Sequence, residues 1–328
     1  MRQSTAAFLL GLCLALPALT QPVNAQSAEA FAFVAMGDMP YAIPDDYAKV
    51  DRLIAAINVA KPAFTLHVGD IKAGSTPCTE EAYRKVLDQF AQFDGPLAYT
   101  PGDNEWTDCH REKAGKYDPL ERLGVIRTMF FGKPGMSLGK SAMVVESQAT
   151  AMPGFETFVE NQRFVKNGVM VVLPHIVGSN NNFEAKNAKT ATEYFARDAA
   201  NQAWLADSFK KAVDTNAKAI VIAFQADPYA TLDNEGNIPR ASGFANTLAT
   251  IADGAKAFGN RPILVITGDN HVIEYQQLRG PDMKPISGAF HLQLMGEAHV
   301  HAVRVTVDPA DPGVFGFTPM IIPENGIY

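Results

Sequence analysis

Four Gly-Asp pairs could place acidic side chains at strand ends: Gly37-Asp38, Gly69-Asp70, Gly102-Asp103 and Gly268-Asp269. Each follows a run of β-forming residues, and most of these runs are continuously apolar, which is typical of strands buried on both faces. In an open α/β sheet, ligands bind beyond the carboxyl ends of the strands, so aspartates far apart in sequence can converge there. One Gly-Asp pair is a weak signal, since such pairs are common in turns. Four of them at strand ends predict a metal site.

The elements around the first three pairs form a regular series. Apolar runs predict strands at 31–36, 64–68 and 97–100, and apolar residues at helical spacing predict helices at 45–59 and 80–93. Strand, helix, strand, helix, strand is a parallel βαβαβ unit, whose strands place their carboxyl ends on one edge of the sheet. The sequence therefore predicts that the first three aspartates lie on the same edge.

The remainder of the chain continues the α/β pattern after an irregular segment at 106–165, for which we predict one helix at 118–130. Strands are predicted at 168–174, 218–225 and 263–267, and helices at 191–213 and 241–258. Three alternating segments at 290–295, 299–307 and 314–318 predict antiparallel strands. No linker or internal repeat separates these elements, so we expect one α/β domain over residues 26–328.

The N-terminal segment has the pattern of a secretory signal peptide. Arg2 precedes an apolar stretch, and Val23-Asn24-Ala25 has the small residues of a cleavage site. We therefore predict a signal peptide at residues 1–25, a periplasmic or secreted protein and no membrane anchor. Of the three cysteines, Cys78 and Cys109 remain after cleavage, and two cysteines in an oxidising compartment predict one disulfide.

The charge balance excludes one class of partner. The 328 residues include 28 Lys and Arg against 35 Asp and Glu, a net charge of −7 at neutral pH. No basic cluster is long enough to neutralise a phosphate backbone, so no nucleic-acid-binding surface is predicted. The sequence indicates nothing about the oligomeric state.

In motif order, the chain resembles the calcineurin-like metallophosphoesterases, the superfamily that includes the purple acid phosphatases. That family carries GDxH, GDxx, GNH(D/E), a strand ending in His, and GHxH on successive strand ends. The resemblance implies a layered fold with central mixed β-sheets flanked by helices. It also implies two metals that share an aspartate, hydrolysis of a small phosphorylated substrate by a metal-bound hydroxide, and therefore a metal-dependent phosphoesterase.

Residue by residue, the motifs keep some family positions and change others. Asp38, Asp70 and His271 match, with Asp70 at the position of the bridging aspartate. Asp103 stands in place of the metal-binding asparagine, and Asn104 in place of the histidine that contacts phosphate. Three further positions that are histidine in the family are Pro40, Gln225 and Asp269. The resemblance thus implies a first site of Asp38, Asp70 and His271, and a second of Asp70, Asp103, Gln225 and Asp269.

The changed positions alter the predicted chemistry. A shell of oxygen ligands favours one or two hard divalent cations, Mn²⁺, Mg²⁺ or Ca²⁺, over Zn²⁺. Asn104 can donate hydrogen bonds to a phosphoryl oxygen but cannot act as an acid. His175, which follows an apolar strand and is the favoured candidate, and His110, which follows Cys109, are the residues that could take that catalytic role. The alternative is a non-catalytic or regulatory metal-binding protein on the same scaffold, which the loss of three histidines favours.

Overall fold

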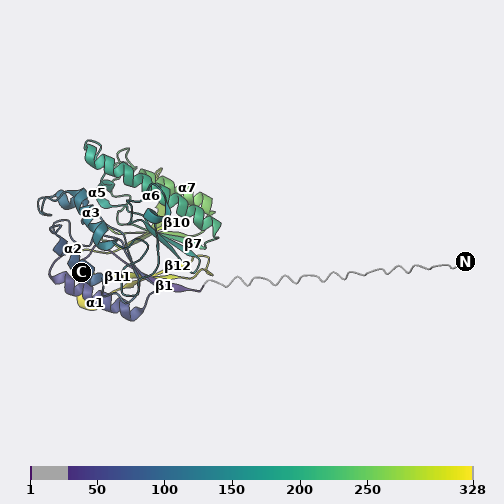
Figure 1. Ribbon diagram of the computed structural model, residues 1–328, viewed down its shortest axis with the longest axis horizontal. Coiled ribbons are helices and arrows are strands. Elements are labelled where there is room, and N and C mark those ends of the chain that lie inside the picture. The colour runs from purple at the N-terminus through teal and green to yellow at the C-terminus, as the bar shows by residue number, and fades with distance from the viewer. Residues whose placement is uncertain (2–28, 327–328) are drawn as a thin grey trace.

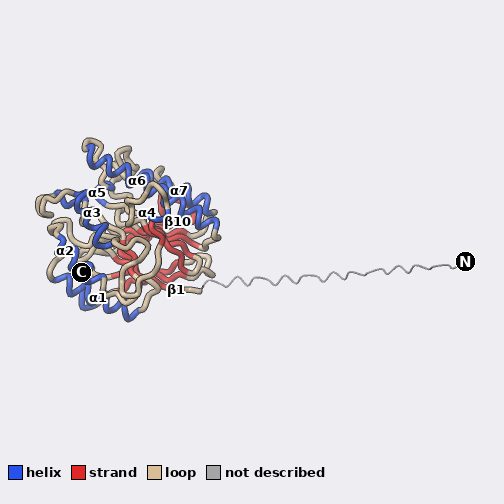
Figure 2. Tube along the Cα trace, viewed as in Figure 1, coloured by secondary structure: helices blue, strands red, loops and turns tan. Residues whose placement is uncertain are grey.

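Two β-sheets pack face to face in this computed structural model, with helices on their outer faces (Figure 1). The structure describes Met1 and residues 29–326, so the predicted signal peptide at 1–25 lies outside the described residues apart from Met1. Figure 2 shows the strands gathered in the centre of the molecule and the helices at its periphery. The layered α/β fold with central mixed sheets is confirmed.

The first sheet has five strands and contains the predicted βαβαβ unit. Its order is β12 (Phe315–Met320), β11 (Ala302–Val307), β1 (Phe31–Met36), β2 (Thr65–His67) and β3 (Leu97–Tyr99). Strands β1, β2 and β3 run parallel, as predicted, whereas β11 and β12 are antiparallel to their neighbours. The carboxyl ends of the three parallel strands therefore lie on one edge.

The second sheet has seven strands. Its order is β4 (Glu146–Ser147), β5 (Gln162–Lys166), β6 (Val169–Leu173), β7 (Ala219–Ala223), β8 (Ile263–Thr267), β10 (Pro285–Gln293) and β9 (Glu274–Arg279). The prediction of an antiparallel strand at 290–295 is wrong for one neighbour, because β10 pairs in parallel with β8. Strands β4, β5 and β9 were not predicted.

The continuous apolar runs are explained by cores on both faces of each sheet. Phe33 and Ala35 of β1 face the core between the sheets, whereas Val34 and Met36 pack against the helices. Helices α1 (Asp45–Ala60), α2 (Glu80–Phe90) and α3 (Pro119–Phe130) contribute to the core on that outer side. Helices α6 (Ala188–Asp214) and α7 (Ala245–Phe258) pack on the outer face of the second sheet.

The helix starts follow ordinary capping chemistry. Side-chain oxygens of Thr79, Asp118 and Asn187 accept hydrogen bonds from the first backbone N–H groups of α2, α3 and α6. Four short turns complete the described elements: η1 (Thr107–His110), α4 (Gln148–Ala151), α5 (Gly178–Asn181) and η2 (Pro323–Asn325).

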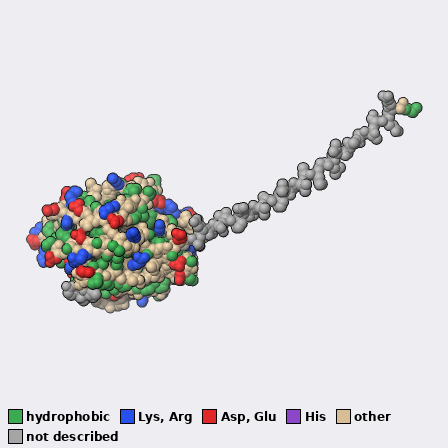
Figure 3. Space-filling model, turned by 90° about the horizontal axis from the view of Figure 1, so that it is seen from below, with side chains coloured by type: hydrophobic (Ala, Val, Ile, Leu, Met, Phe, Trp, Pro, Cys, Tyr) green, Lys and Arg blue, Asp and Glu red, His purple; other side chains and the backbone are tan. Residues whose placement is uncertain are grey.

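The surface adds two observations. No helix within the described part of the chain is long and apolar enough to cross a membrane. On the face shown in Figure 3, basic and acidic side chains are interspersed.

Candidate metal and phosphate site

The six predicted metal ligands all follow strands that end on one edge of the two sheets. Asp38, Asp70 and Asp103 come after β1, β2 and β3, Gln225 after β7, and Asp269 and His271 after β8. Four of these residues have left-handed backbones, with φ of 55° at Asp38 and Asp70, 79° at Asp269 and 62° at His271. Backbone angles that L-residues rarely adopt are found preferentially at functional sites, where the surrounding structure compensates for the strain.

Direct contacts join the strand ends of the two sheets around Asp38. Its Oδ1 accepts a hydrogen bond from the backbone N–H of Asp269 at 3.0 Å and lies 3.5 Å from Nε2 of His271. Nε2 of Gln225 donates to Oδ1 of Asp269 at 3.1 Å. Residues more than 200 positions apart in sequence are thus in contact, as the strand-end argument predicts.

Asp70 lies in a second group of contacts. Its Oδ2 accepts hydrogen bonds from the hydroxyl of Tyr41 at 2.7 Å and from Nδ2 of Asn104 at 2.6 Å, and its Oδ1 accepts from the Asn104 backbone at 3.1 Å. Nδ2 of Asn104 also donates to the Tyr41 hydroxyl at 2.8 Å. Both oxygens of this carboxylate therefore have protein donors.

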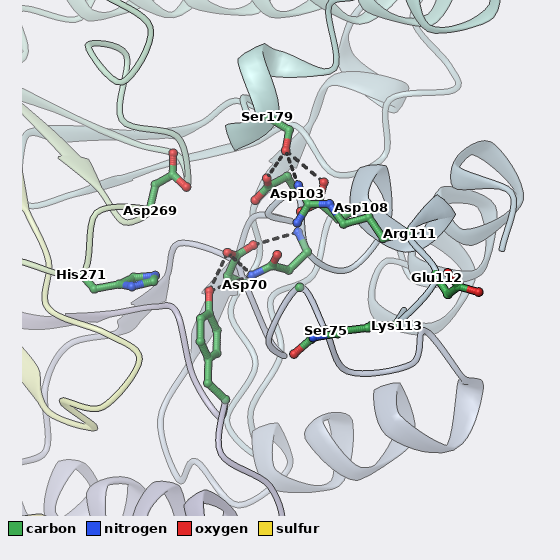
Figure 4. A pocket seen from close by; sticks show the side chains of 13 residues that line it. Asp70, Ser75, Asp103, Asp108, Arg111, Glu112, Lys113, Ser179, Asp269 and His271 are labelled. Atoms are coloured by element: carbon green, nitrogen blue, oxygen red, sulfur yellow. Dashed lines mark hydrogen bonds and ion pairs between the residues drawn. The ribbon is translucent and has the colours of Figure 1, made fainter. Parts of the chain in front are cut away.

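Asp103 belongs to a third group, formed with Asp108 and Ser179. The Ser179 hydroxyl lies 2.7 Å from Oδ2 of Asp103 and 3.0 Å from Oδ1 of Asp108 (Figure 4). Since a hydroxyl carries one proton, it can donate to only one of the two carboxylates at a time.

The turn that carries Ser179 is left-handed. Four consecutive residues, Ser179 to Asn182, have φ between 49° and 58°, and asparagine is among the few L-residues that tolerate this conformation. A Cβ atom on Gly178 would lie 2.9 Å from both Oδ2 of Asp103 and Oδ1 of Asp269. Only glycine at this position leaves the space between the two carboxylates free.

One open pocket of about 620 Å³ lies over these groups. Figure 4 shows Asp269 and His271 on one side of it, Arg111, Glu112 and Lys113 on the other, and Asp70 and Asp103 between them. The full lining is Tyr41, Asp70, Gly74, Ser75, Asp103, Asn104, Asp108, Arg111, Glu112, Lys113, Ser179, Asp269 and His271.

The electrostatics of the pocket are those of crowded carboxylates. Burial and the charges of Asp103 and Glu105 raise the pKa of Asp70 well above its usual range. Burial and the charges of Asp103 and Asp38 raise the pKa of Asp269 to about 7. Burial lowers the pKa of His271, but hydrogen bonding to Asp38 and the charges of Asp38 and Glu297 outweigh it, so the net shift is upward. Such a cluster is stabilised by a cation or by protonation.

The oxygen and nitrogen atoms of these side chains are suitable ligands for a divalent cation, but in this structure several of the carboxylate oxygens already accept hydrogen bonds. Within residues 29–326, no group of three or more His, Cys, Asp or Glu side chains is arranged to hold a metal ion. Tyr41, Asn104 and Ser179 donate to carboxylate oxygens that a metal would use. Oδ2 of Asp38, by contrast, is buried without a partner. A cation in the pocket would need some of these donors to release their carboxylates.

His175, the second predicted catalytic residue, lies in the interior. It is fully buried and is absent from the pocket lining; its Nδ1 lies 2.9 Å from Oε1 of Glu160, and its ring packs on Trp106. Its backbone carbonyl accepts hydrogen bonds from Arg197 and Asn201. His175 therefore contacts the buried residues Glu160, Arg197 and Asn201 and does not line the pocket.

The predicted disulfide between Cys78 and Cys109 is present, with both side chains buried. It joins the loop after β2 to the loop after β3, and both loops line the pocket.

Sequence reasoning missed Tyr41, Asp108, Arg111 and Ser179. For Asp108 and Arg111, the adjacent Cys109 was an available signal, since a disulfide between two strand-end loops fixes its neighbours near the site.

In three dimensions the chain is similar to known phosphatases. A dimetal phosphatase from Danio rerio superposes with a TM-score of 0.54 at 11% identity, over 89% of this chain and 98% of that one. The structure of PhoD superposes with a TM-score of 0.54 at 13% identity, over 88% of this chain and 68% of that one. No protein-family model and no curated protein sequence matches the chain. At this identity the likeness shows the fold alone, and the metallophosphoesterase fold predicted from the motifs is confirmed.

Proposed function

From its metallophosphoesterase fold, we propose that this protein is a metal-dependent phosphoesterase that hydrolyses a phosphate mono- or diester. The observation that carries the proposal is the pocket itself: carboxylates from both sheets crowd around it, and burial together with the neighbouring acidic charges raises the pKa values of Asp70 and Asp269. A phosphate anion cannot enter such a pocket unless that charge is neutralised. One or two divalent cations would supply the neutralising charge.

The donor set determines which cation we propose. Asp38, Asp70 and His271 are one group of candidate ligands, and Asp70, Asp103, Gln225 and Asp269 are the second. Since all but one of these residues offer oxygen, Mn²⁺, Mg²⁺ and Ca²⁺ suit them better than Zn²⁺. Such a cation, when bound, lowers the pKa of a water and polarises a phosphoryl oxygen.

The surrounding side chains have roles of their own in the proposal. Asn104, whose amide lines the pocket, would donate a hydrogen bond to a phosphoryl oxygen in place of its present contacts with Asp70 and Tyr41. Burial and the nearby charge of Asp70 raise the pKa of Tyr41 well above its usual value, which keeps its hydroxyl protonated. Tyr41 can therefore orient Asp70 as a donor but not act as a base.

A non-catalytic metal-binding scaffold is the second candidate function. The observation that favours it is the set of hydrogen bonds that occupies both oxygens of Asp70, the residue that two metals would share. If these bonds persist in solution, one site at most can fill, and the attacking water loses its second metal.

Metal-dependent hydrolysis distinguishes the two candidates. The purified protein is assayed with aryl phosphate mono- and diesters after chelation and again after addition of Mn²⁺, Mg²⁺ or Ca²⁺. We expect Mn²⁺-stimulated turnover that falls by about a hundredfold or more in Asp70→Asn, because a metal ligand contributes several kcal/mol to the transition state. The control is Asp253→Asn, an exposed carboxylate on α7 that pairs with Lys256. Metal binding without turnover of either ester would support the scaffold instead.

A further inference from the structure

Arg111 is held at the pocket wall that faces Asp269 and His271. Its Nη1 pairs with Oδ2 of Asp108 at 2.5 Å, and its Nη2 lies 3.4 Å from the Ser179 hydroxyl. Asp108 is buried, whereas half of the Arg111 side chain is exposed to the pocket. One edge of the guanidinium is therefore anchored on a buried carboxylate while its other donors remain available.

The backbone around Arg111 is fixed as well. Arg111 follows η1, its N–H donates to the Asp108 carbonyl at 2.9 Å, and its carbonyl accepts from Ala114 and Lys116. The disulfide at Cys109 ties this segment to the loop after β2. A long cationic side chain on a constrained backbone loses little additional freedom when it binds an anion.

The guanidinium also lies beside the residue proposed to contact the phosphate. A Cβ atom on Gly74 would meet Oδ1 of Asn104 at 2.6 Å and Nη1 of Arg111 at 3.0 Å, so the two side chains approach each other over this glycine. An anion held by Arg111 would thus lie next to a phosphoryl group on Asn104.

The charges on the two sides of the pocket differ in sign. On the Arg111 side, Glu112 pairs with Lys116 and Asp108 with Arg111, whereas Lys113 lines the pocket and makes no ion pair within residues 29–326. The Arg111 side therefore has excess positive charge, whereas Asp269 and His271 lie on the opposite side and Asp70 and Asp103 lie between the two. A ligand with a single anionic group would leave the Arg111 side without a partner.

We propose that Arg111 and Lys113 bind a second anionic group of the substrate, so that the site takes organophosphates with a further phosphate or carboxylate group. As a statement about the substrate, this inference rests on the proposed phosphoesterase function. Arginine binds both kinds of anion through two parallel hydrogen bonds. Arg111 is then a residue that determines specificity, and it contacts the part of the substrate that does not react.

Equilibrium binding tests the inference without requiring turnover. Calorimetric titrations in the presence of Mn²⁺ compare inorganic phosphate with imidodiphosphate, whose second group is a phosphate, and with phosphonoacetate, whose second group is a carboxylate. We expect at least one doubly anionic probe to bind the unaltered protein about tenfold or more tightly than inorganic phosphate, as charged hydrogen bonds provide. The probe with the larger gain identifies the second group.

Three variants assign the gain to the proposed residues. Arg111→Gln is expected to reduce the affinity ratio to near one, and Arg111→Lys to restore part of it, since lysine keeps the charge but not the paired donors. Lys113→Gln, which breaks no ion pair within residues 29–326, is expected to reduce the ratio to a smaller extent. The matched control is Lys133→Gln, an exposed lysine outside the pocket lining, which is expected to keep the ratio.

The outcomes separate this inference from the proposed function. An unaltered protein that binds all three probes equally, or an Arg111→Gln variant that keeps the full ratio, overturns the inference even if the enzyme hydrolyses aryl phosphates. An absence of metal-stimulated turnover overturns the proposed function, whereas the probe affinities still decide whether the second anion site exists.

Discussion

At the scale of single residues, the side-chain oxygens of Asp70 accept more hydrogen bonds than those of any other predicted ligand. Two side chains and one backbone N–H donate to its oxygens, and its backbone has the left-handed angles of a strained corner. Donors of this kind orient a carboxylate, and their loss commonly reduces metal affinity or activity by about 10- to 100-fold.

Tyr41→Phe tests that positioning role. The change removes one donor to Asp70 and one acceptor for Asn104, so we expect kcat to fall by about tenfold. Steady-state kinetics with an aryl phosphate measure kcat, and a thermal unfolding curve shows whether the variant keeps its fold. A variant with unchanged kcat would show that the hydroxyl has no part in orienting the site.

His175 is a residue whose position suggests a stabilising role in addition to the catalytic one that the sequence predicts. Burial raises the pKa of its partner Glu160, but the charge of Arg127 and the contacts with His175 outweigh this effect and lower the pKa to about 2. A carboxyl with a lowered pKa stabilises the folded state above its unfolded pKa, and this contribution is lost as pH falls from about 4.5 to about 2.

Glu160→Gln is therefore expected to lower the free energy of unfolding at neutral pH by about 3 kcal/mol, because it removes the buried charge that pairs with the half-buried Arg127. Denaturant unfolding at several pH values measures the difference between the two proteins, which should shrink below pH 4.5. A difference independent of pH would contradict the role of this ion pair.

His175→Gln, assayed in parallel, shows whether kcat falls while the fold is kept, as a catalytic acid requires.

At the scale of elements, the strand ends could be predicted, but the loops between them could not. The apolar runs of β1, β2, β6, β7 and β8 indicate strands buried on both faces, and the structure shows cores on both faces. Strand β9 lies at an edge with nearly all its residues exposed, so no hydrophobic period marks it. β5 has polar residues at three of its five positions and adjoins a segment without a period, so no continuous apolar run marks it.

The direction of β10 also depended on information outside its own residues. Alternation predicts a half-exposed strand but not its neighbour, and here β10 returns beside β8 in parallel, with β9 on its other side. The left-handed turn at residues 178–182 was predicted only as a polar segment. Its asparagines allow the conformation, but the partners that hold it, such as Arg197 on α6, are distant in sequence.

The disulfide is the element-scale feature with the most direct consequence for the pocket. Replacing both cysteines by alanine removes a cross-link that closes a loop of 31 residues, so we expect a loss of about 3 kcal/mol in unfolding free energy. Because Arg111 lies two residues after Cys109 in the loop after β3, KM is expected to rise more than kcat falls. Thermal unfolding and steady-state kinetics measure both; addition of a reductant to the double variant is the control and should change nothing further. An unchanged KM would show that the loop holds its position without the cross-link.

At the scale of the whole molecule, two sheets meet at one edge and bring like charges together. Asp38, Asp70 and Asp269 all have raised pKa values, for which burial is the largest cause. A carboxyl whose pKa is raised by folding binds more protons in the folded state, so its contribution to stability falls as pH rises. For Asp269 the window lies between its ordinary pKa of 3.8 and about 7.

The metal-free protein is therefore expected to lose stability between pH 4 and pH 7, and Mn²⁺ at pH 7.5 is expected to restore it. Thermal unfolding with a chelator and with Mn²⁺ measures the two effects, and Asp269→Asn should weaken the pH dependence in the chelated sample. A melting temperature that is unaffected by Mn²⁺ at pH 7.5 would contradict the proposed compensation of charge.

Anomalous diffraction from a crystal soaked in Mn²⁺ tests the central claim most directly, because it locates the cation and its ligands together. The claim predicts a strong peak in the pocket, within about 2.0 to 2.6 Å of an oxygen of Asp70 and of at least one carboxylate of another strand end. Clear density for the pocket with no such peak at saturating Mn²⁺, or a peak bound only to surface residues elsewhere, would contradict it.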